Sequence, residues 1–266
     1  MKLSRGPLPR LSQRRASFAL PDLKHVEIAV IHEAKEWVVV SKPSGLLSVP
    51  GKTGTEDNMT ARVSKLYPRA EHVKAVHRLD LSTSGLLMFA LTRRALSELS
   101  KLFATRKVHK KYIALLSGPK MSAQGQFQKG WQFQKGWQFQ KVDSSKGSIS
   151  LPLRLDPFQR PLQLVDPVHG KESITEWSLR SNTNKGRLVE LTPITGRTHQ
   201  LRIHCAHPLG LGRPIIGDEL YGHQLNQSRA ATQLCLHAEQ LYFTDPMDRQ
   251  KVQLTLPAPD WGINST

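Results

Sequence analysis

The segment with the most distinctive chemistry is His77-Arg-Leu-Asp80, which is followed by a turn of small residues, Ser82-Thr-Ser-Gly85. The neighbouring cations favour the charged form of the Asp80 carboxyl group, and the turn supplies backbone N–H groups that donate hydrogen bonds. An ionised carboxylate here is a candidate catalytic group, although an Asp that only caps a turn would look the same. A protein kinase would need His-Arg-Asp without the leucine, a glycine-rich loop and Asp-Phe-Gly, and the sequence has none of these. It has no P-loop either.

A second cluster is Thr195-Gly-Arg-Thr-His-Gln-Leu-Arg202. Gly196 allows a tight turn, so Arg197 is expected to project from the start of the helix that follows. A planar guanidinium suits two hydrogen bonds to a carboxylate or a contact with a phosphate. His199 and Arg202 are spaced to share one helix face. The competing interpretation is a basic, solvated helix face.

A third cluster is the basic run Arg106-Lys-Val-His-Lys-Lys111-Tyr112, which enters an alternating strand. Basic side chains beside an aromatic ring suit contacts with the backbone and a base of RNA. The competing interpretation is a charged edge strand that discourages aggregation.

Several histidines and cysteines lie close enough in the sequence to be considered as metal ligands. His204, Cys205 and His207 lie close together, and Cys235 and His237 follow later. Zinc sites usually show paired ligands at recurring short spacings, which this pattern does not match. We therefore expect these residues to be structural and the protein to hold no metal.

Composition restricts the class of partner. The chain has 266 residues with 38 Lys and Arg against 21 Asp and Glu, a formal charge of +17, which indicates a polyanionic partner, either nucleic acid or anionic lipid. With 38% hydrophobic and 22% charged residues the chain is expected to be globular. Two cysteines exclude a disulfide scaffold and favour a reducing compartment, and no apolar stretch is long enough to span a membrane.

The elements that must position these clusters are short strands and a few helices. Helices are expected at 57–66, 93–104 and 198–206, the last with Thr198 as its N-cap. Alternating or apolar β-rich runs predict strands at 26–31, 36–41, 84–91, 108–116, 147–153, 172–179, 187–191, 234–241 and 252–256. Strands interleaved with helices indicate an α/β or α+β fold with a mixed sheet.

Two regions lie outside this pattern. Residues 1–25 are expected to be a basic, disordered arm, and their lack of acids up to Phe18 is also typical of a mitochondrial transit peptide. Residues 124–146 contain Gln-Phe-Gln-Lys-Gly-Trp at 126–131 and 132–137, with a partial copy at 138–141. We interpret this region as a repeat expansion in a surface loop, the alternative being an aromatic platform that stacks on bases.

Taken together, these segments resemble the RluA-type pseudouridine synthases. The resemblance runs in order from about residue 33 to residue 258. Each motif alone is weak, but the ordered set is specific. The matching motifs are Lys42-Pro-Ser-Gly-Leu-Leu-Ser-Val-Pro-Gly51, His77-Arg-Leu-Asp80 with Thr83-Ser-Gly85, Lys111-Tyr112, Gly170-Lys171, Thr195-Gly-Arg-Thr-His-Gln-Leu-Arg202, Pro214-Ile-Ile-Gly-Asp218 with Tyr221-Gly222, and Leu236-His-Ala238.

The resemblance implies an α/β (α+β) catalytic domain over residues 26–266, with a mixed, mainly antiparallel sheet, flanking helices and a central basic cleft. It implies isomerisation of uridine in RNA, by cleavage of the N1–C1′ bond, rotation of the base and rejoining through C5, without a metal or cofactor. Asp80 matches the essential aspartate, which either attacks covalently or removes a sugar proton. Arg197 matches the arginine paired with that carboxylate, and Tyr112 the tyrosine that lies against the uracil.

The resemblance further implies that Arg78 enters the space left by the flipped nucleotide, and we expect His77, Lys111 and Arg202 to bind RNA with it. Many family members carry an S4-type RNA-binding module before the catalytic domain, and about 25 residues are too few for one here. The short form favours a dual-specificity enzyme acting on a stem-loop of ribosomal or transfer RNA. We expect a cytoplasmic monomer with no obligate protein partner, and organellar targeting stays open.

Two rival functions remain. The first is a homologue that binds or remodels RNA without isomerising it. The second is a general basic nucleic-acid-binding protein, which would bind DNA and RNA equally with a steep salt dependence.

Overall fold

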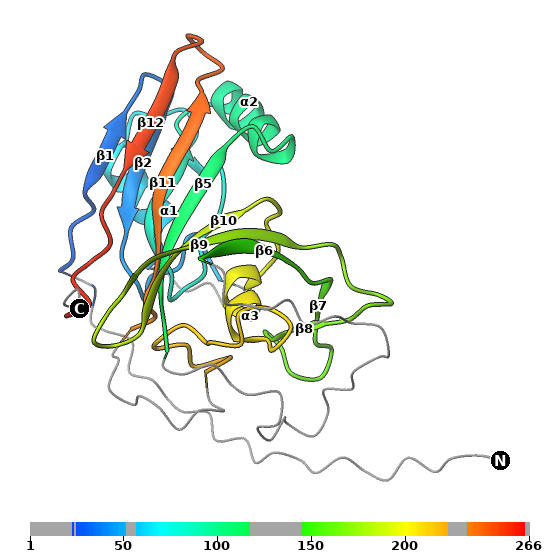
Figure 1. Ribbon diagram of the computed structural model, residues 1–266. Helices are drawn as coiled ribbons and strands as arrows, with labels where there is room; N and C mark the ends of the chain where they lie inside the picture. The colour runs from blue at the N-terminus through cyan, green and yellow to red at the C-terminus, as the bar shows by residue number, and fades with distance from the viewer. Residues whose placement is uncertain (1–22, 24, 52–56, 118–144, 223–232, 264–266) are drawn as a thin grey trace.

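The structure, a computed structural model, describes residues 23, 25–51, 57–117, 145–222 and 233–263. Its main feature is a 10-stranded sheet in the order β1-β2-β4-β11-β5-β10-β9-β6, with β12 paired to β11 and β3 paired to β4 (Figure 1). All pairings in this sheet are antiparallel except β4 with β11, so the expected mixed, mainly antiparallel sheet is confirmed. The strands are β1 (Val30–Glu33), β2 (Trp37–Lys42), β3 (Lys74–Ala75), β4 (Ser84–Ala90), β5 (His109–Leu116), β6 (Lys146–Ser150), β9 (Ile174–Asn182), β10 (Arg187–Pro193), β11 (Leu236–Thr244) and β12 (Lys251–Thr255).

Strands β2 and β4 are buried on both faces, which explains their nearly continuous apolar sequences. Val38 and Val40 pack with residues of helix α1 (Met59–Leu66), whereas Trp37 and Val39 pack on the other side with Ala95 and Leu99 of helix α2 (Arg93–Ala104). Successive side chains of a strand point to opposite faces, so one strand contributes to two clusters. The sheet therefore carries a helix on each side here, as predicted.

Both helices begin with a capping side chain. Asn58 caps α1 by accepting a hydrogen bond from the backbone N–H of Ala61 at 3.0 Å. Thr92 caps α2 by accepting from the backbone N–H of Ala95 at 3.1 Å. Such caps satisfy N–H groups that the first helical turn leaves free, and their positions fix where the two predicted helices start.

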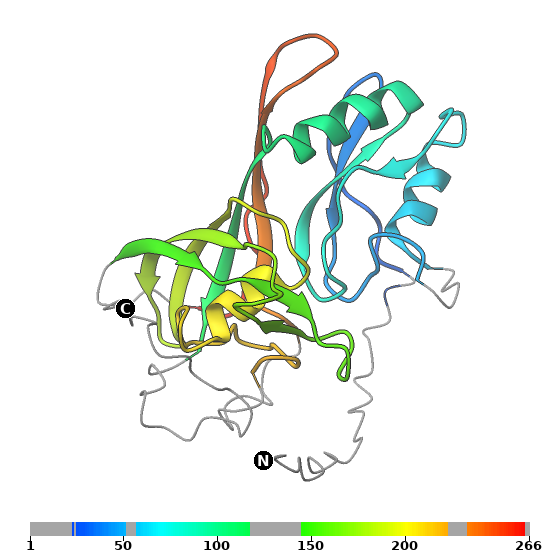
Figure 2. The same cartoon turned by 90° about the vertical axis from the view of Figure 1, so that its right-hand side faces the viewer.

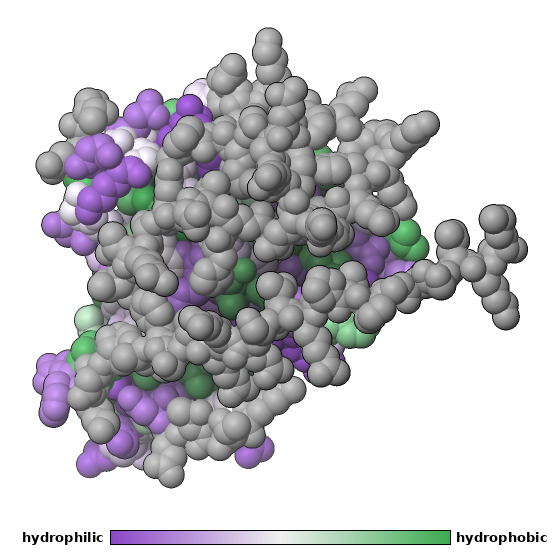
Figure 3. Space-filling view, turned by 90° about the horizontal axis from the view of Figure 1, so that it is seen from below, coloured by the Kyte–Doolittle hydropathy of each residue, from purple (hydrophilic) through white to green (hydrophobic). Residues whose placement is uncertain are grey.

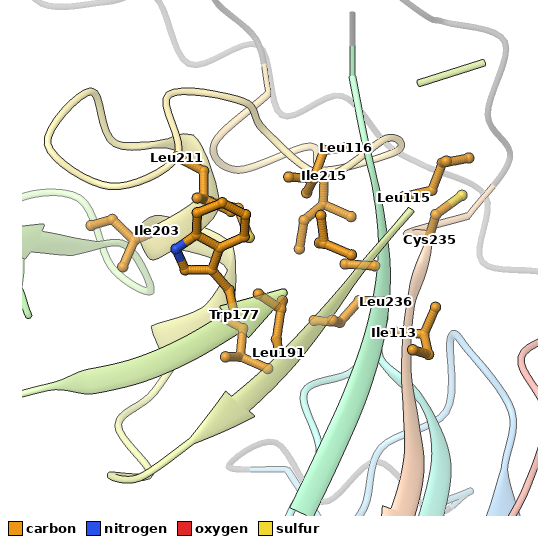
Figure 4. Packing of buried hydrophobic residues seen from close by; sticks show 14 of the residues in the cluster. Ile113, Leu115, Leu116, Trp177, Leu191, Ile203, Leu211, Ile215, Cys235 and Leu236 are labelled. Carbon is orange, nitrogen blue, oxygen red and sulfur yellow. The ribbon is translucent and has the colours of Figure 1, made fainter. Parts of the chain in front are cut away.

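The second half of the sheet is covered by helix α3 (Gln200–Ala206). Figure 4 shows Trp177 of β9 beside Leu191 of β10, with Ile203 of α3 and Leu211 on the other side of the ring. Figure 2 shows α3 on one side of the long central strands and α1 and α2 on the other. Strands β5 and β11 run between these two regions and hold them together.

Three local predictions needed correction. The predicted strand 26–31 is β1, which begins only at Val30. The predicted strand 147–153 is divided between β6 and β7 (Leu153–Leu155), because Pro152 has no N–H to continue the ladder. Strand β7 pairs instead with β8 (Gln163–Val165) in a separate two-stranded sheet. Thr198 is not the N-cap of α3, since that position is taken by His199 and no side chain caps this helix.

The charged run before Tyr112 does not lie on an edge strand. Strand β5 is interior, with β11 on one side and β10 on the other. Aggregation control at a sheet edge is therefore not the reason for its basic residues.

The predicted N-terminal arm lies outside the described residues except for residues 23 and 25, and so does the repeat-containing insertion except for residues 145 and 146. Among the helices that the structure describes, none combines the length and apolar character needed to cross a membrane. In the view from below, hydrophilic residues dominate the left-hand edge of the described surface, and hydrophobic residues form only small patches (Figure 3).

Candidate active site

The predicted clusters meet at one cleft of about 1170 Å³ between the two halves of the molecule. Asp80, Tyr112 and Arg197 all line this cleft, although they lie on a loop, on β5 and on the loop before α3. Residues of three widely separated segments thus face one space. The remaining walls come mainly from segments 47–49, 77–83, 103–110 and 192–202.

The loop that carries Asp80 is fastened to the segment that follows β2. The Ser48 hydroxyl donates to the carbonyl oxygen of Leu79 at 2.7 Å and accepts from the backbone N–H of the same residue at 3.0 Å. The Ser44 hydroxyl donates to the carbonyl oxygen of Ser82 at 2.7 Å. The first two sequence motifs of the resemblance therefore form one structural unit, and its geometry fixes the backbone on both sides of Asp80.

Lys42 is the centre of this unit. Its side chain is fully buried, and its Nζ donates to the carbonyl oxygens of Pro43 at 2.9 Å, Leu81 at 2.9 Å and Thr83 at 2.8 Å. Burial lowers the pKa of Lys42 to about 7, and the negative charge of Asp80 opposes that shift. Sequence reasoning quoted Lys42 within a motif but gave it no role, because Leu81 and Thr83, two of its three partners, lie about 40 residues away.

Gly85 allows β4 to approach β11 closely. Its φ is +117°, and a Cβ at this position would lie 2.4 Å from the carbonyl oxygen of Ala238. Next to it, the Ser84 hydroxyl and His237 Nδ1 are 2.9 Å apart. The parallel contact of β4 with β11 therefore requires glycine, and it fixes the end of the loop that carries Asp80.

Tyr112 lies in the cleft at the end of the basic run. Burial, together with the charge of Asp80, raises the pKa of Tyr112 above its ordinary value. The phenol is therefore neutral near pH 7 and retains its O–H as a hydrogen-bond donor. Its neighbour Lys110 also lines the cleft, with Nζ 5.8 Å from the centre of the Phe103 ring, and burial lowers the pKa of Lys110.

Arg78 and His77 occupy different positions although they are adjacent in sequence. Arg78 is exposed at the cleft wall, where it can reach a bound ligand. The His77 ring stacks on Phe103 with centroids 4.8 Å apart, and its Nε2 accepts from the backbone N–H of Met88 at 3.2 Å. Burial and the nearby Lys110 lower the pKa of His77 to about 3, so the ring is neutral and attaches this loop to β4.

Arg197 lines the cleft but does not form the expected ion pair in this structure. It is exposed, and its Nε donates to the carbonyl oxygen of Glu172 at 3.2 Å. The ion pairs within 4.0 Å among the described residues do not include one between Arg197 and Asp80. The Gln200 side chain fixes the loop by accepting from the backbone N–H of Arg197 at 3.0 Å and from the Thr195 hydroxyl at 2.8 Å.

Arg202 is buried, with 4% of its surface exposed, so the interpretation of a solvated helix face is wrong at this position. Its guanidinium makes two hydrogen bonds to Asp218, at 2.9 and 2.7 Å. Burial alone would lower the pKa of Arg202, but the bonds and charge of Asp218 outweigh it and raise the pKa. Sequence reasoning could not detect this pairing, because the two residues are 16 positions apart in separate segments.

His199 is a cleft residue that sequence reasoning did not assign to the site. Its backbone is left-handed, with φ of +53°, and its Nδ1 lies 3.0 Å from the Tyr221 hydroxyl. The Tyr221 hydroxyl also accepts from the backbone N–H of Gln163 at 2.9 Å, and its ring lies 5.5 Å from the Arg202 guanidinium. Burial lowers the pKa of His199, and the charge of Asp80 opposes that shift. The motifs around residues 199, 218 and 221 therefore form one connected wall of the cleft.

Lys111 is not among the residues that line the cleft. Side chains alternate along β5, so Lys111 points away from the face that carries Lys110 and Tyr112. Its Nζ forms an ion pair with Glu190 at 2.8 Å.

The candidate metal ligands have other partners. His204 Nδ1 lies 2.9 Å from the Thr175 hydroxyl, and His237 Nε2 lies 3.0 Å from the carbonyl oxygen of Leu256. In the part of the chain that the structure describes, no three His, Cys, Asp or Glu side chains are grouped so that they could hold a metal ion. Cys205 and Cys235 are buried free thiols.

Comparison with known proteins gives a consistent result. The family described as RNA pseudouridylate synthase matches residues 36–207. The chain is 37% identical over 231 residues to the dual-specificity RNA pseudouridine synthase RluA of Pasteurella multocida, covering 86% of this chain and 92% of the relative. For the protein of the same name from Haemophilus ducreyi the identity is 40% over 222 residues, covering 83% and 88%.

Solved structures show the same fold. Human RNA pseudouridylate synthase domain containing 1 superposes with a TM-score of 0.67 at 26% identity, covering 88% of this chain and 84% of that one. Human RNA pseudouridylate synthase domain containing 4 gives a TM-score of 0.63 at 25% identity, covering 88% and 89%.

Proposed function

The chain belongs to the RNA pseudouridylate synthase family, and we propose that it converts uridine to pseudouridine in ribosomal and transfer RNA, with Asp80 as the catalytic residue. The relatives that are 37–40% identical are named dual-specificity RNA pseudouridine synthases. The observation that carries the proposal for the site is that Asp80, Tyr112 and Arg197 line one cleft from three separate segments.

The reaction is an isomerisation, so its atoms balance without a co-substrate. The N1–C1′ bond breaks, a C5–C1′ bond forms, C5 loses a proton and N1 gains one. A carboxylate can assist either by attacking the nucleotide covalently or by removing a proton from the sugar. Asp80 is suited to both roles because its side chain is partly exposed in the cleft, where a substrate can reach it.

Several other residues surround Asp80 in the cleft or support its loop. The buried Lys42 side chain supports the loop by donating a hydrogen bond to the carbonyl oxygen of Leu81. The Asp80 charge opposes the lowering of the pKa of both Lys42 and His199, which shows that these groups lie within its electrostatic range. Tyr112 stays protonated beside the carboxylate and presents an aromatic face against which a uracil ring can lie. The cleft thus offers a charged catalytic group, an aromatic surface and cations for an anionic substrate.

The target uridine must leave the base stack to enter this cleft. Flipping a nucleotide costs a few kcal/mol, and the cost is smallest in loops where pairing is absent. We propose that Arg78, which is exposed at the cleft wall, occupies the space that the base leaves. Arg197 is exposed in the cleft, where its Nε donates to the carbonyl oxygen of Glu172, and we propose that its guanidinium contacts a phosphate or Asp80 when RNA is bound. We therefore propose a stem-loop as the substrate.

Replacement of Asp80 by Asn tests the assignment, because it removes the charge at nearly constant shape. We expect Asp80→Asn to bind stem-loop RNA with a Kd within about threefold of the native value and to release no tritium from RNA labelled at C5 of uridine. Asp248→Asn is the matched control, since that carboxylate is exposed and does not line the cleft. Full tritium release by Asp80→Asn would refute the assignment.

The same assay separates the rival functions. An RNA-binding homologue without activity would bind the stem-loop but release no tritium even as the native protein. A general nucleic-acid-binding protein would bind duplex DNA equally well. We propose residues 26–266 as the catalytic domain, acting as a cytoplasmic monomer.

A further inference from the structure

The hairpin formed by β7 and β8 ends in a loop that is ordered by its own hydrogen bonds. Asp156 Oδ1 accepts from the backbone N–H groups of Phe158 at 2.8 Å and Gln159 at 3.2 Å. The backbone N–H of Asp156 donates to the carbonyl oxygen of Leu162 at 2.9 Å, which closes the loop. An ion pair between Arg154 and Asp166 joins the two strands at the base of the hairpin. Hydrogen bonds within the loop therefore give the tip a defined shape.

This ordered tip presents an aromatic ring to solvent. Phe158 is 93% exposed, the largest value among the exposed large hydrophobic residues that the structure describes. Single exposed apolar residues are common, so exposure alone assigns no role. The location of the ring and the residues around it indicate its role.

The loop is attached to the rim of the cleft. Pro161 lines the same cleft as Asp80. The backbone N–H of Gln163 donates to the Tyr221 hydroxyl, which contacts His199 in the cleft wall. In Figure 1 the hairpin lies beside α3, the helix that follows the Arg197 loop. An RNA whose flipped nucleotide occupies the cleft would therefore pass next to the Phe158 ring.

The chemistry around the ring fits nucleic acid. Arg160, two residues further on, is exposed and cationic. An aromatic ring stacks on any base, and a neighbouring cation attracts the phosphate beside it. We propose that the β7–β8 hairpin is a second RNA contact, in which Phe158 stacks on an unpaired base close to the target uridine and Arg160 contacts its phosphate. This inference rests on the proposed function, because it takes RNA as the substrate.

The test measures binding of a fluorescein-labelled synthetic RNA hairpin with uridines in its loop, in the Asp80→Asn background so that no turnover occurs. We expect Phe158→Ala to raise Kd about tenfold, equivalent to about 1.4 kcal/mol. Phe158→Trp should bind at least as tightly as the parent, and Phe158→Leu, which keeps apolar area but cannot stack, should resemble Phe158→Ala. Val168→Ala is the matched control, because Val168 is 68% exposed on the neighbouring turn, and it should leave Kd unchanged.

A second arm locates the partner base. Each loop nucleotide of the RNA is replaced in turn by an abasic one, and one replacement should abolish the difference between Phe158 and Phe158→Ala. Equal Kd values for Phe158→Ala, Phe158→Trp and the parent would overturn the proposal. The exposed Phe158 ring would then contact a partner other than RNA, such as a protein. This result is distinct from failure of the proposed function, which would appear as no tritium release by the native enzyme.

Discussion

Lys42 Nζ lies 2.8 Å from the carbonyl oxygen of Thr83, three residues after Asp80. Together with the bonds to the carbonyls of Pro43 and Leu81, this contact uses all three hydrogens of an ammonium group. Burying a cation is costly unless its hydrogen bonds are satisfied, and here backbone carbonyl groups satisfy them, two of which belong to the Asp80 loop. Lys42 is therefore a positioning residue for the loop that carries Asp80.

We expect Lys42→Met to lower the maximal rate of tritium release at least about tenfold while changing KM little. The substitution keeps the apolar stem but leaves three carbonyl groups without their donor, and each buried unsatisfied group costs about 1–3 kcal/mol. The Asp80 backbone would then lose its fixed position, which affects the chemical step more than binding. Single-turnover kinetics measure this change. Lys65→Met, on an exposed lysine of α1, is the control, and an equal loss there would contradict the prediction.

The lowered pKa of Lys42 predicts that the stability of the folded protein depends on pH. The pKa of Lys42 is about 7 in the folded protein, against 10.5 for an unperturbed lysine. Between these values the unfolded chain binds more protons than the folded one, so the free energy of unfolding should rise with pH from about 7 to about 10. We expect the stability of the native protein relative to Lys42→Met to increase over this range in urea titrations. A difference that stays flat or falls would show that Lys42 is not buried as a titrating group.

Sequence patterns predicted the elements more reliably than the contacts between them. Strand β4 and helix α2 were identifiable because their burial is set by apolar periodicity within about ten residues. For Arg202 the sequence offered an RNA contact or a solvated face, and neither anticipated the buried pair with Asp218, because local spacing carries no information about a partner from another segment. Lys42 was overlooked for the same reason. In both cases a long-range partner determines the role of the residue.

The cleft itself was anticipated only through the resemblance. Local patterns placed Asp80, Tyr112 and Arg197 on a turn, a strand and a helix start, but the order of strands that brings them together does not follow from one sequence. The exposed ring of Phe158 also has no sequence signal, because a Phe in an apolar hairpin would ordinarily be expected to pack inward.

The close approach of β4 to β11 predicts a strong effect at Gly85. A Cβ would lie 2.4 Å from the Ala238 carbonyl oxygen and 2.5 Å from its nitrogen, both backbone atoms that cannot move alone. We expect Gly85→Ala to lower the free energy of unfolding by roughly 3 kcal/mol or more. Gly196→Ala is the control, since its nearest neighbour would be Lys110 Nζ at 4.0 Å, and chemical denaturation should show little change. Equal stability of the two variants would contradict the close contact.

The buried pair of Arg202 and Asp218 predicts another loss of stability. The Asp218 side chain has no exposed surface, and Asp218→Asn would leave the Arg202 cation without its charged partner. Removing one member of a buried ion pair costs about 3–5 kcal/mol, so a clear shift of the denaturation midpoint is expected. Glu98→Gln, which breaks an exposed pair with Lys101, should leave the midpoint unchanged. A small effect at Asp218 would show that water reaches the pair.

Arg197 lines the cleft and Lys111 does not, so the two residues give a direct test of where RNA binds. The sequence and its resemblance assign Arg197 to pairing with Asp80 and Lys111 to RNA binding, whereas the geometry places only Arg197 in the cleft and joins Lys111 to Glu190 at 2.8 Å. We expect Arg197→Ala to reduce single-turnover tritium release at least about tenfold. The substitution removes the exposed cation that the loop before α3 presents to a phosphate or to Asp80. Lys111→Ala should retain activity within about twofold and change the salt dependence of binding little. If Lys111→Ala were the more damaging variant, RNA would have to contact the opposite face of β5, and the cleft would not be the main binding surface.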